Sequence, residues 1–250
     1  MLNDLINELK RDANPEKAKL YQRFFKTGKG EYGEGDVFLG LTMPQQRAII
    51  KKYTDLSFSD LQVLLESKNH EYRMAALLIL NNKYKALNKF RSRPSKMPDE
   101  KAKRNGLEKR RIYEFYMKNT KNINNWDLVD LSAPNVPGAF LLKAGEGTEI
   151  LRILAKSDNL WERRIAIIST AAFIRDGKLG ETLAISEMLL HDEHDLIHKA
   201  VGWMLREVGK KNKNVLEIFL LSRHKEMPRT MLRYSIEKFS PEERKKWMQK

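Results

Sequence analysis

The sequence contains no cysteine, which excludes disulfide bonds and thiolate metal sites. It also has no apolar run close to the roughly 20 residues that a membrane-spanning helix needs. The first eight residues carry Asp4 and Glu8 where a secretory signal would carry bases. Signatures of serine hydrolases and kinases are absent, as is the Walker loop. We therefore expect a cytoplasmic protein with no membrane segment and no bound cofactor.

Acidic residues are outnumbered, since 33 Asp and Glu stand against 47 Lys and Arg, a formal net charge of +14. Such an excess favours a polyanionic partner such as nucleic acid. Between residues 82 and 111 the chain has twelve bases and three acids. The part from Arg91 to Gly106 includes Pro94 and Pro98 and almost no apolar residue. We predict a flexible basic insertion there, within a single domain of residues 1–250.

Apolar residues recur at the helical spacing, and no segment shows a sustained strand alternation. Helix starts are indicated by Asn14-Pro15, by Thr42 with Gln45, and by Ser57 or Ser59. Longer helices are expected over residues 70–84, 159–175, 195–210 and 227–239. Several of them begin alike at intervals of about 30 to 35 residues, which is typical of HEAT- or armadillo-like repeats. The sequence thus predicts an all-α superhelix, an α-solenoid, with a basic concave face.

Two stretches imitate known motifs. Residues 28–33 match the glycine pattern of dinucleotide-binding proteins, but a helix precedes them and neighbouring acids would repel phosphate, so we interpret them as a structural loop. His194 and His198 have the spacing of two zinc ligands, yet a catalytic zinc also needs a third ligand and a correctly placed base. His191 is the only nearby candidate. We expect no bound metal.

The stretch from Asn124 to Asp130 puts an indole and a carboxylate four residues apart. On a helix this spacing places Trp126 and Asp130 on one face, while Leu128 and Val129 point elsewhere and can pack. Two interpretations are open. Asp130 could cap a neighbouring helix beside a core tryptophan. Alternatively, its carboxylate could stand near a substrate whose sugar or base lies against the indole.

Trp203 has a similar ambiguity. It shares a helical face with Lys199 and, approximately, with Arg206. Two cations around an aromatic ring would suit a phosphate-binding edge. A core tryptophan flanked by solvated charges fits the same spacing.

Four segments taken in order resemble the AlkD-like DNA alkylation repair family. They are the glycine-rich loop of residues 28–40, the helix with Trp126 and Asp130, residues 161–164, and residues 199–206. The resemblance runs from about residue 15 to residue 240. It implies a HEAT-like DNA glycosylase that removes N3- and N7-alkylated purines from duplex DNA without flipping the base.

The resemblance also implies roles for particular residues. Asp130 would be the catalytic carboxylate, completed by Arg164 beside it. Trp126 and Trp203 would contact the sugar and backbone of the lesion nucleotide. Further DNA contacts are expected at Phe24, Arg163, Lys199 and Arg206. The segment 91–106 is longer and more basic than the family pattern, which puts the DNA footprint in doubt.

Two functions of different classes fit this sequence. One is an alkylpurine glycosylase of base-excision repair, and the other is a non-catalytic HEAT-repeat protein that binds nucleic acid. Charge and repeats support both, and only Trp126, Asp130 and Arg164 together favour the enzyme. A peptide-binding adaptor is disfavoured by the charge. We expect a monomer whose partner is double-stranded DNA containing alkylated purines.

Overall fold

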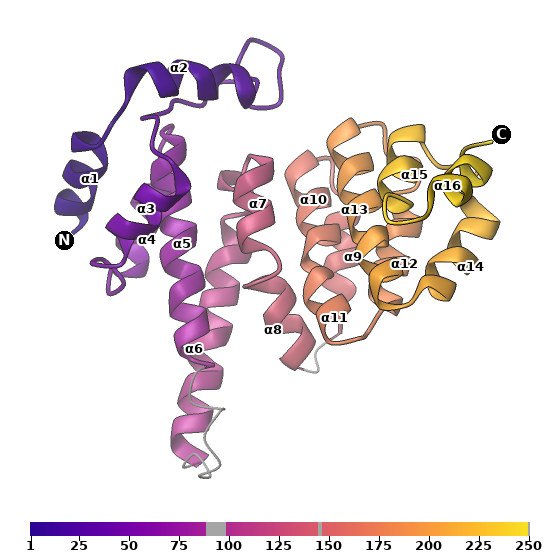
Figure 1. Ribbon diagram of the computed structural model, residues 1–250. Coiled ribbons are helices and arrows are strands. Elements are labelled where there is room, and N and C mark those ends of the chain that lie inside the picture. The colour runs from indigo at the N-terminus through magenta and orange to yellow at the C-terminus, as the bar shows by residue number, and fades with distance from the viewer. Residues whose placement is uncertain (89–98, 145–146, 250) are drawn as a thin grey trace. The chain divides into compact units, whose positions relative to one another are not determined.

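The computed structural model describes residues 1–88, 99–144 and 147–249 (Figure 1). Within these ranges the chain forms helices and no strand, apart from an isolated bridge between Val37 and Asn69. The predicted all-α class is confirmed. No helix in this part of the chain is both long and apolar enough to cross a membrane. The chain divides into two compact units, residues 1–132 and 133–250.

The first unit is organised around a long buried helix, α5 (His70–Ala86), which contacts α3, α4, α6 and α7. Its residues 74–80 are all buried, so the middle of this helix is apolar on every side. The other elements of the unit are α1 (Leu2–Arg11), α2 (Pro15–Phe24), α3 (Met43–Ile50), α4 (Phe58–Leu65), α6 (Asp99–Lys118), the 3₁₀ helix η2 (Thr120–Asn122) and α7 (Trp126–Ser132).

Helix starts in this unit follow the predicted caps. The Asn14 side chain accepts a hydrogen bond from the Lys17 N–H at 3.0 Å, with Pro15 as the first helical residue of α2. Thr42 and Ser57 each form a capping box with the residue three positions later. These local bonds satisfy N–H groups that the first turn of a helix leaves unpaired.

Helix α6 begins earlier than the sequence suggested. Residues 99–106, expected to belong to an unpacked insertion, form its first two turns, and residues 100–106 lie largely exposed. Lys, Arg, Ala and Glu form helices readily even where no apolar stripe packs against a core. The prediction for residues 91–98 falls outside the described residues.

The glycine-rich loop between α2 and α3 is held by a carboxylate from α5. Glu71 is buried and accepts hydrogen bonds from the backbone N–H groups of Leu39, Gly40 and Leu41 at 2.8 to 3.2 Å. Gly40 has φ +84°, and a Cβ there would lie 2.2 Å from the Asn14 carbonyl oxygen, so a side chain does not fit. Residues 28–33 follow α2 and form turns, so the strand that a dinucleotide fingerprint needs before its glycines is not present there, as expected.

The second unit is built around α13 (Asp195–Lys211), which packs against α10, α14 and α15. At the α13–α15 contact the helices approach closely, because a Cβ on Gly202 would lie 2.5 Å from the Met231 carbonyl oxygen. The other helices are α8 (Pro137–Ala144), α9 (Glu149–Ala155), α10 (Leu160–Ser169), α11 (Ala171–Arg175), α12 (Gly180–Met188), α14 (Lys213–Arg223), α15 (Arg229–Ser235) and α16 (Pro241–Met248).

Two of the long helices expected here are shorter than predicted. The stretch 159–175 is divided into α10 and α11 at Thr170, whose hydroxyl donates a hydrogen bond to the Ile167 carbonyl oxygen at 2.7 Å. The stretch 227–239 contributes only the seven residues of α15. Successive short helices packed on one another remain consistent with a helical repeat fold, whereas the basic concave face stays a prediction.

Candidate functional site

Helix α7 carries the predicted carboxylate and indole. Leu128 and Val129 have no exposed surface, while Trp126 and Asp130 are half-buried. The helix begins at Trp126, whose backbone N–H donates to the Asn125 side-chain oxygen at 2.8 Å. The sequence pattern is therefore realised as predicted, with one face packed inward and the indole and carboxylate one turn apart on another.

Trp126 lies at the end of an aromatic cluster. Its ring stacks on Phe25 with the centroids 5.3 Å apart and an interplanar angle of 22°. Phe24 meets the same indole edge-on at 5.8 Å and is 62% exposed. Phe25 stacks in turn on Phe38, which faces His70 at 4.6 Å. Two residues predicted for the site, Phe24 and Trp126, are thus in contact, and the cluster restricts how the indole can move.

A buried polar network lies directly beneath this aromatic cluster. His70 bridges two carboxylates, with Nδ1 3.1 Å from Asp36 Oδ2 and Nε2 2.9 Å from Asp127 Oδ2. Arg73 pairs with the other oxygen of Asp36 at 2.7 Å. The Asn125 side chain donates to Asp36 at 3.4 Å. Two carboxyl groups and two cationic side chains therefore anchor the residues on either side of Trp126.

The charges and hydrogen bonds of this network favour the charged forms of His70 and Asp36. Burial alone would lower the pKa of His70, but the charges and hydrogen bonds of Asp127 and Asp36 raise it to about 9. Burial would raise the pKa of Asp36, yet the hydrogen bond from His70 and the charge of Arg73 hold it below its usual value. We infer that His70 is an imidazolium at neutral pH and links α5 to α7.

Asp130 lies near the buried phenol of Tyr116. Burial chiefly raises the pKa of Tyr116 far above its ordinary value, and the charge of Asp130 raises it further. Tyr116 and Ser132 share a hydrogen bond of 3.0 Å between their hydroxyl groups. Asp130 therefore lies close enough to Tyr116 for its charge to act on the phenol.

In the second unit, both predicted arginines bind other residues of the same unit. Arg164 is 5% exposed, and its Nη1 donates to the Leu196 carbonyl oxygen at 2.6 Å. Arg163 pairs with Asp192 at 2.6 Å and also donates to the carbonyl oxygens of Ser157 and Asp158. Both side chains fasten α10 to neighbouring segments, and their contacts with DNA stay predictions.

The predicted edge on α13 consists of Lys199, Trp203 and Arg206, all half-buried. Lys199 pairs with Asp195 at 2.6 Å, and Arg206 pairs with Glu237 of the segment after α15. Each cation therefore already has a carboxylate partner. A DNA phosphate would have to displace that carboxylate or share the cation with it.

Beside Trp203 the second unit has a cavity of about 480 Å³. Arg175, Lys210 and Lys211 line it together with the indole. Lys210 pairs with Glu207 at 2.6 Å, and Glu207 is the only acid in the lining. Sequence reasoning missed these three bases. The helical spacing of Lys210 from Trp203 could have indicated one of them, but the approach of Arg175 depends on how α11 packs.

His194 and His198 both make hydrogen bonds to the backbone that stabilise the fold. Nδ1 of His194 accepts a hydrogen bond from the Leu196 N–H at 3.1 Å and so caps α13. Nε2 of His198 bonds the Asp192 carbonyl oxygen. In residues 1–88, 99–144 and 147–249, no three His, Asp or Glu side chains are placed to hold a metal ion together.

The chain is similar to known proteins in sequence pattern and in fold. No curated protein matches the chain. A solved structure described as a predicted DNA alkylation repair enzyme from Enterococcus faecalis superposes with a TM-score of 0.65, at 18% identity, over 92% of this chain and 97% of that one. At this identity the likeness supports the fold. The family model of the DNA alkylation repair enzymes matches residues 5–239, so the chain belongs to the DNA alkylation repair enzyme family.

Proposed function

We propose that this member of the family is an AlkD-like DNA glycosylase that hydrolyses the N-glycosidic bond of N3- and N7-alkylated purines in duplex DNA. The observation that carries the proposal is the surface of α7. There an indole and a carboxylate lie one turn apart, partly exposed, on a helix whose other side is fully packed. The buried network around His70 fixes the first turn of that helix through Asp127.

The chemistry requires little from the protein. Alkylation at N3 or N7 makes the purine cationic, so the bond to C1′ can break with both electrons passing to the base, which leaves neutral. No general acid is needed. Positive charge then builds on the sugar, as in glycoside hydrolysis. A fixed anion stabilises that charge more in the transition state than in the ground state.

Asp130 would supply this anion and would orient the water whose oxygen bonds to C1′ and whose proton passes to solvent. The face of the Trp126 indole suits an electron-poor sugar, because aromatic faces attract cations and polarised C–H groups. In the second unit, Trp203 would contact the sugar and backbone of the lesion nucleotide, and Arg164 would complete the catalytic site. Lys199, Arg206 and Arg163 would approach phosphates, and Phe24 would extend the aromatic surface beside Trp126.

The alternative is a non-catalytic nucleic-acid-binding protein. The observation that favours it is the exposed first half of α6, where Lys103 and Arg104 stand on a helix with few packing contacts. Such a surface binds phosphates without any chemistry.

One assay separates the two functions. Wild-type protein is incubated with duplex DNA containing 7-methylguanine, and free base is measured against a no-protein control. The glycosylase proposal predicts release that turns over and increases with protein concentration. Binding without release above the spontaneous rate would leave only the second function.

A further inference from the structure

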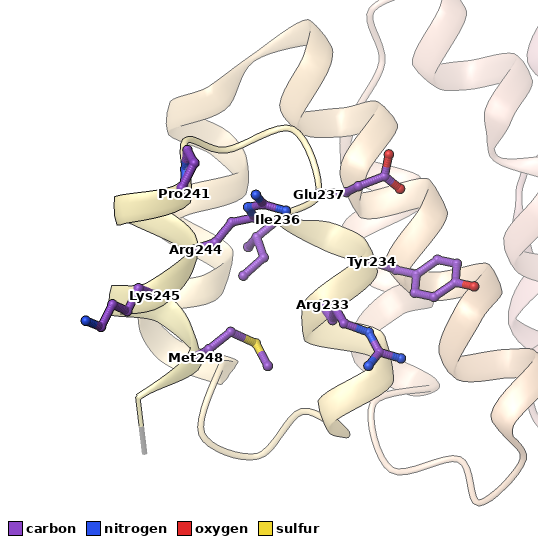
Figure 2. A pocket seen from close by; sticks show the side chains of 8 residues that line it. All are labelled: Arg233, Tyr234, Ile236, Glu237, Pro241, Arg244, Lys245 and Met248. Carbon is purple, nitrogen blue, oxygen red and sulfur yellow. The ribbon is translucent and has the colours of Figure 1, made fainter.

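A groove in the second unit lies between α15 and α16. Its volume is about 640 Å³. Figure 2 shows the eight side chains that line it, contributed by the two helices and their connection. Ile236, Pro241 and Met248 supply apolar walls, and Tyr234 adds an aromatic ring.

Three cations line this groove and are available to a ligand. Arg233, Arg244 and Lys245 are exposed, and within the described part of the chain none of them forms an ion pair or a side-chain hydrogen bond. This distinguishes them from the cations predicted to bind DNA. Lys199 and Arg206 are both paired with carboxylates.

The groove contains one acidic side chain, and its charge is already compensated. Glu237 pairs with Arg206 on one side and with Lys238 at 3.0 Å on the other. Those two cations lower the pKa of Glu237, with the hydrogen bond from Lys238 as the largest cause. The lining therefore presents a net positive surface, which matches an anionic occupant.

The arrangement of the cations indicates the kind of anion. In Figure 2, Arg244 reaches into the groove toward Ile236, while Lys245 and Arg233 lie at opposite edges. A single phosphate ion would be met by cations that converge on one point. Cations spread across a groove suit a row of phosphates, and the apolar walls between them suit the C–H faces of the intervening sugars.

The groove also adjoins the predicted edge on α13, because Arg206 of that edge pairs with Glu237 of the groove lining. We propose that the α15–α16 groove binds the phosphodiester backbone of duplex DNA through Arg233, Arg244 and Lys245, extending the contact proposed around Trp203. The inference depends on DNA being the partner, as the proposed function holds. It does not depend on base release.

The test compares two variants of equal charge. The groove variant is Arg233→Gln/Arg244→Gln/Lys245→Gln, and the control is Lys156→Gln/Lys178→Gln/Lys225→Gln, which removes three exposed cations elsewhere in the second unit. Both sets lie on the surface, and circular dichroism checks that both variants fold. Affinity for an undamaged duplex is measured over a series of salt concentrations.

If each groove cation contacts one phosphate, the slope of log K against log salt falls in magnitude by about 2.7 in the groove variant and far less in the control. Equal slopes in the two variants, or a groove variant that binds like wild type, would overturn the inference. Base release from lesion DNA at saturating protein is measured in parallel. Equal slopes in the two variants with intact base release would reject the groove alone. A smaller slope in the groove variant with no base release would reject the glycosylase alone.

Discussion

The imidazole Nε2 of His70 lies 2.9 Å from Oδ2 of Asp127, the residue that follows Trp126, and this contact fastens the start of α7 to α5. The same ring bonds Asp36 through its other nitrogen and packs against Phe25 and Phe38. Because a buried cation here joins two carboxylates, the position of the indole depends on the protonation of a histidine.

This contact predicts a pH dependence of stability. The folded-state pKa of His70, about 9, lies above its unfolded value of 6.5. Its stabilising contribution is therefore complete below pH 6.5 and is lost as the pH rises through 9. By linkage the shift corresponds to roughly 3 kcal/mol. Urea unfolding of the wild type between pH 6 and pH 10 should show this decrease.

Asp127→Asn serves as the matched variant, since it keeps a hydrogen-bonding side chain and removes the charge. It should move the loss of stability to lower pH, because less negative charge then faces His70. The His70 titration followed by NMR gives the same comparison directly. A His70 pKa near 6.5 in the wild type would contradict the charged network.

The two adjacent phenylalanines predict opposite sensitivities to truncation. Phe25 is 8% exposed and stacks on Trp126, so Phe25→Ala should destabilise the protein by about 3 to 5 kcal/mol. Phe24 is 62% exposed, so Phe24→Ala should cost below about 1 kcal/mol. Thermal unfolding of both variants checks this, and equal effects would show that the aromatic cluster is arranged differently.

Gly35 and Gly40 have nearly the same φ but different surroundings, so their alanine variants distinguish backbone strain from a steric clash. Gly35 has φ +85° with open space around its Cα, so Gly35→Ala should cost only the left-handed strain of about 1 kcal/mol. Gly40 has φ +84° and faces the Asn14 carbonyl, so Gly40→Ala should cost more than about 3 kcal/mol. Chemical denaturation measures both. Similar losses would mean that the loop does not pack closely on α2.

Much of the fold could be predicted from the sequence, because apolar periodicity and capping residues act locally. The starts at Asn14, Thr42 and Ser57 are examples. Helix ends were harder to predict, since the apolar pattern continues through Thr170, whose hydroxyl donates a hydrogen bond to the Ile167 carbonyl oxygen where α10 ends. The first turns of α6 were missed because low apolar content argues against packing but not against helix formation.

The candidate site was predictable only in part. Trp126 and Asp130 follow from a spacing within one helix, and their exposure agrees with it. His70, Asp36 and Asp127 could not be found this way, because positions 34 and 57 residues apart meet only in the folded unit. The pairing of Arg163 with Asp192 is likewise long-range and changes how available that cation is.

The most direct test of the central claim is the rate of 7-methylguanine release from duplex DNA by Asp130→Asn, measured in single turnover beside the wild type. The amide keeps the shape of the side chain and removes its charge. We predict that release falls by roughly 100-fold or more, as is usual when a preorganised electrostatic group is removed, while DNA affinity stays within a few fold. Release by the variant at the wild-type rate would contradict the account, because the charge of Asp130 would then play no part in breaking the bond.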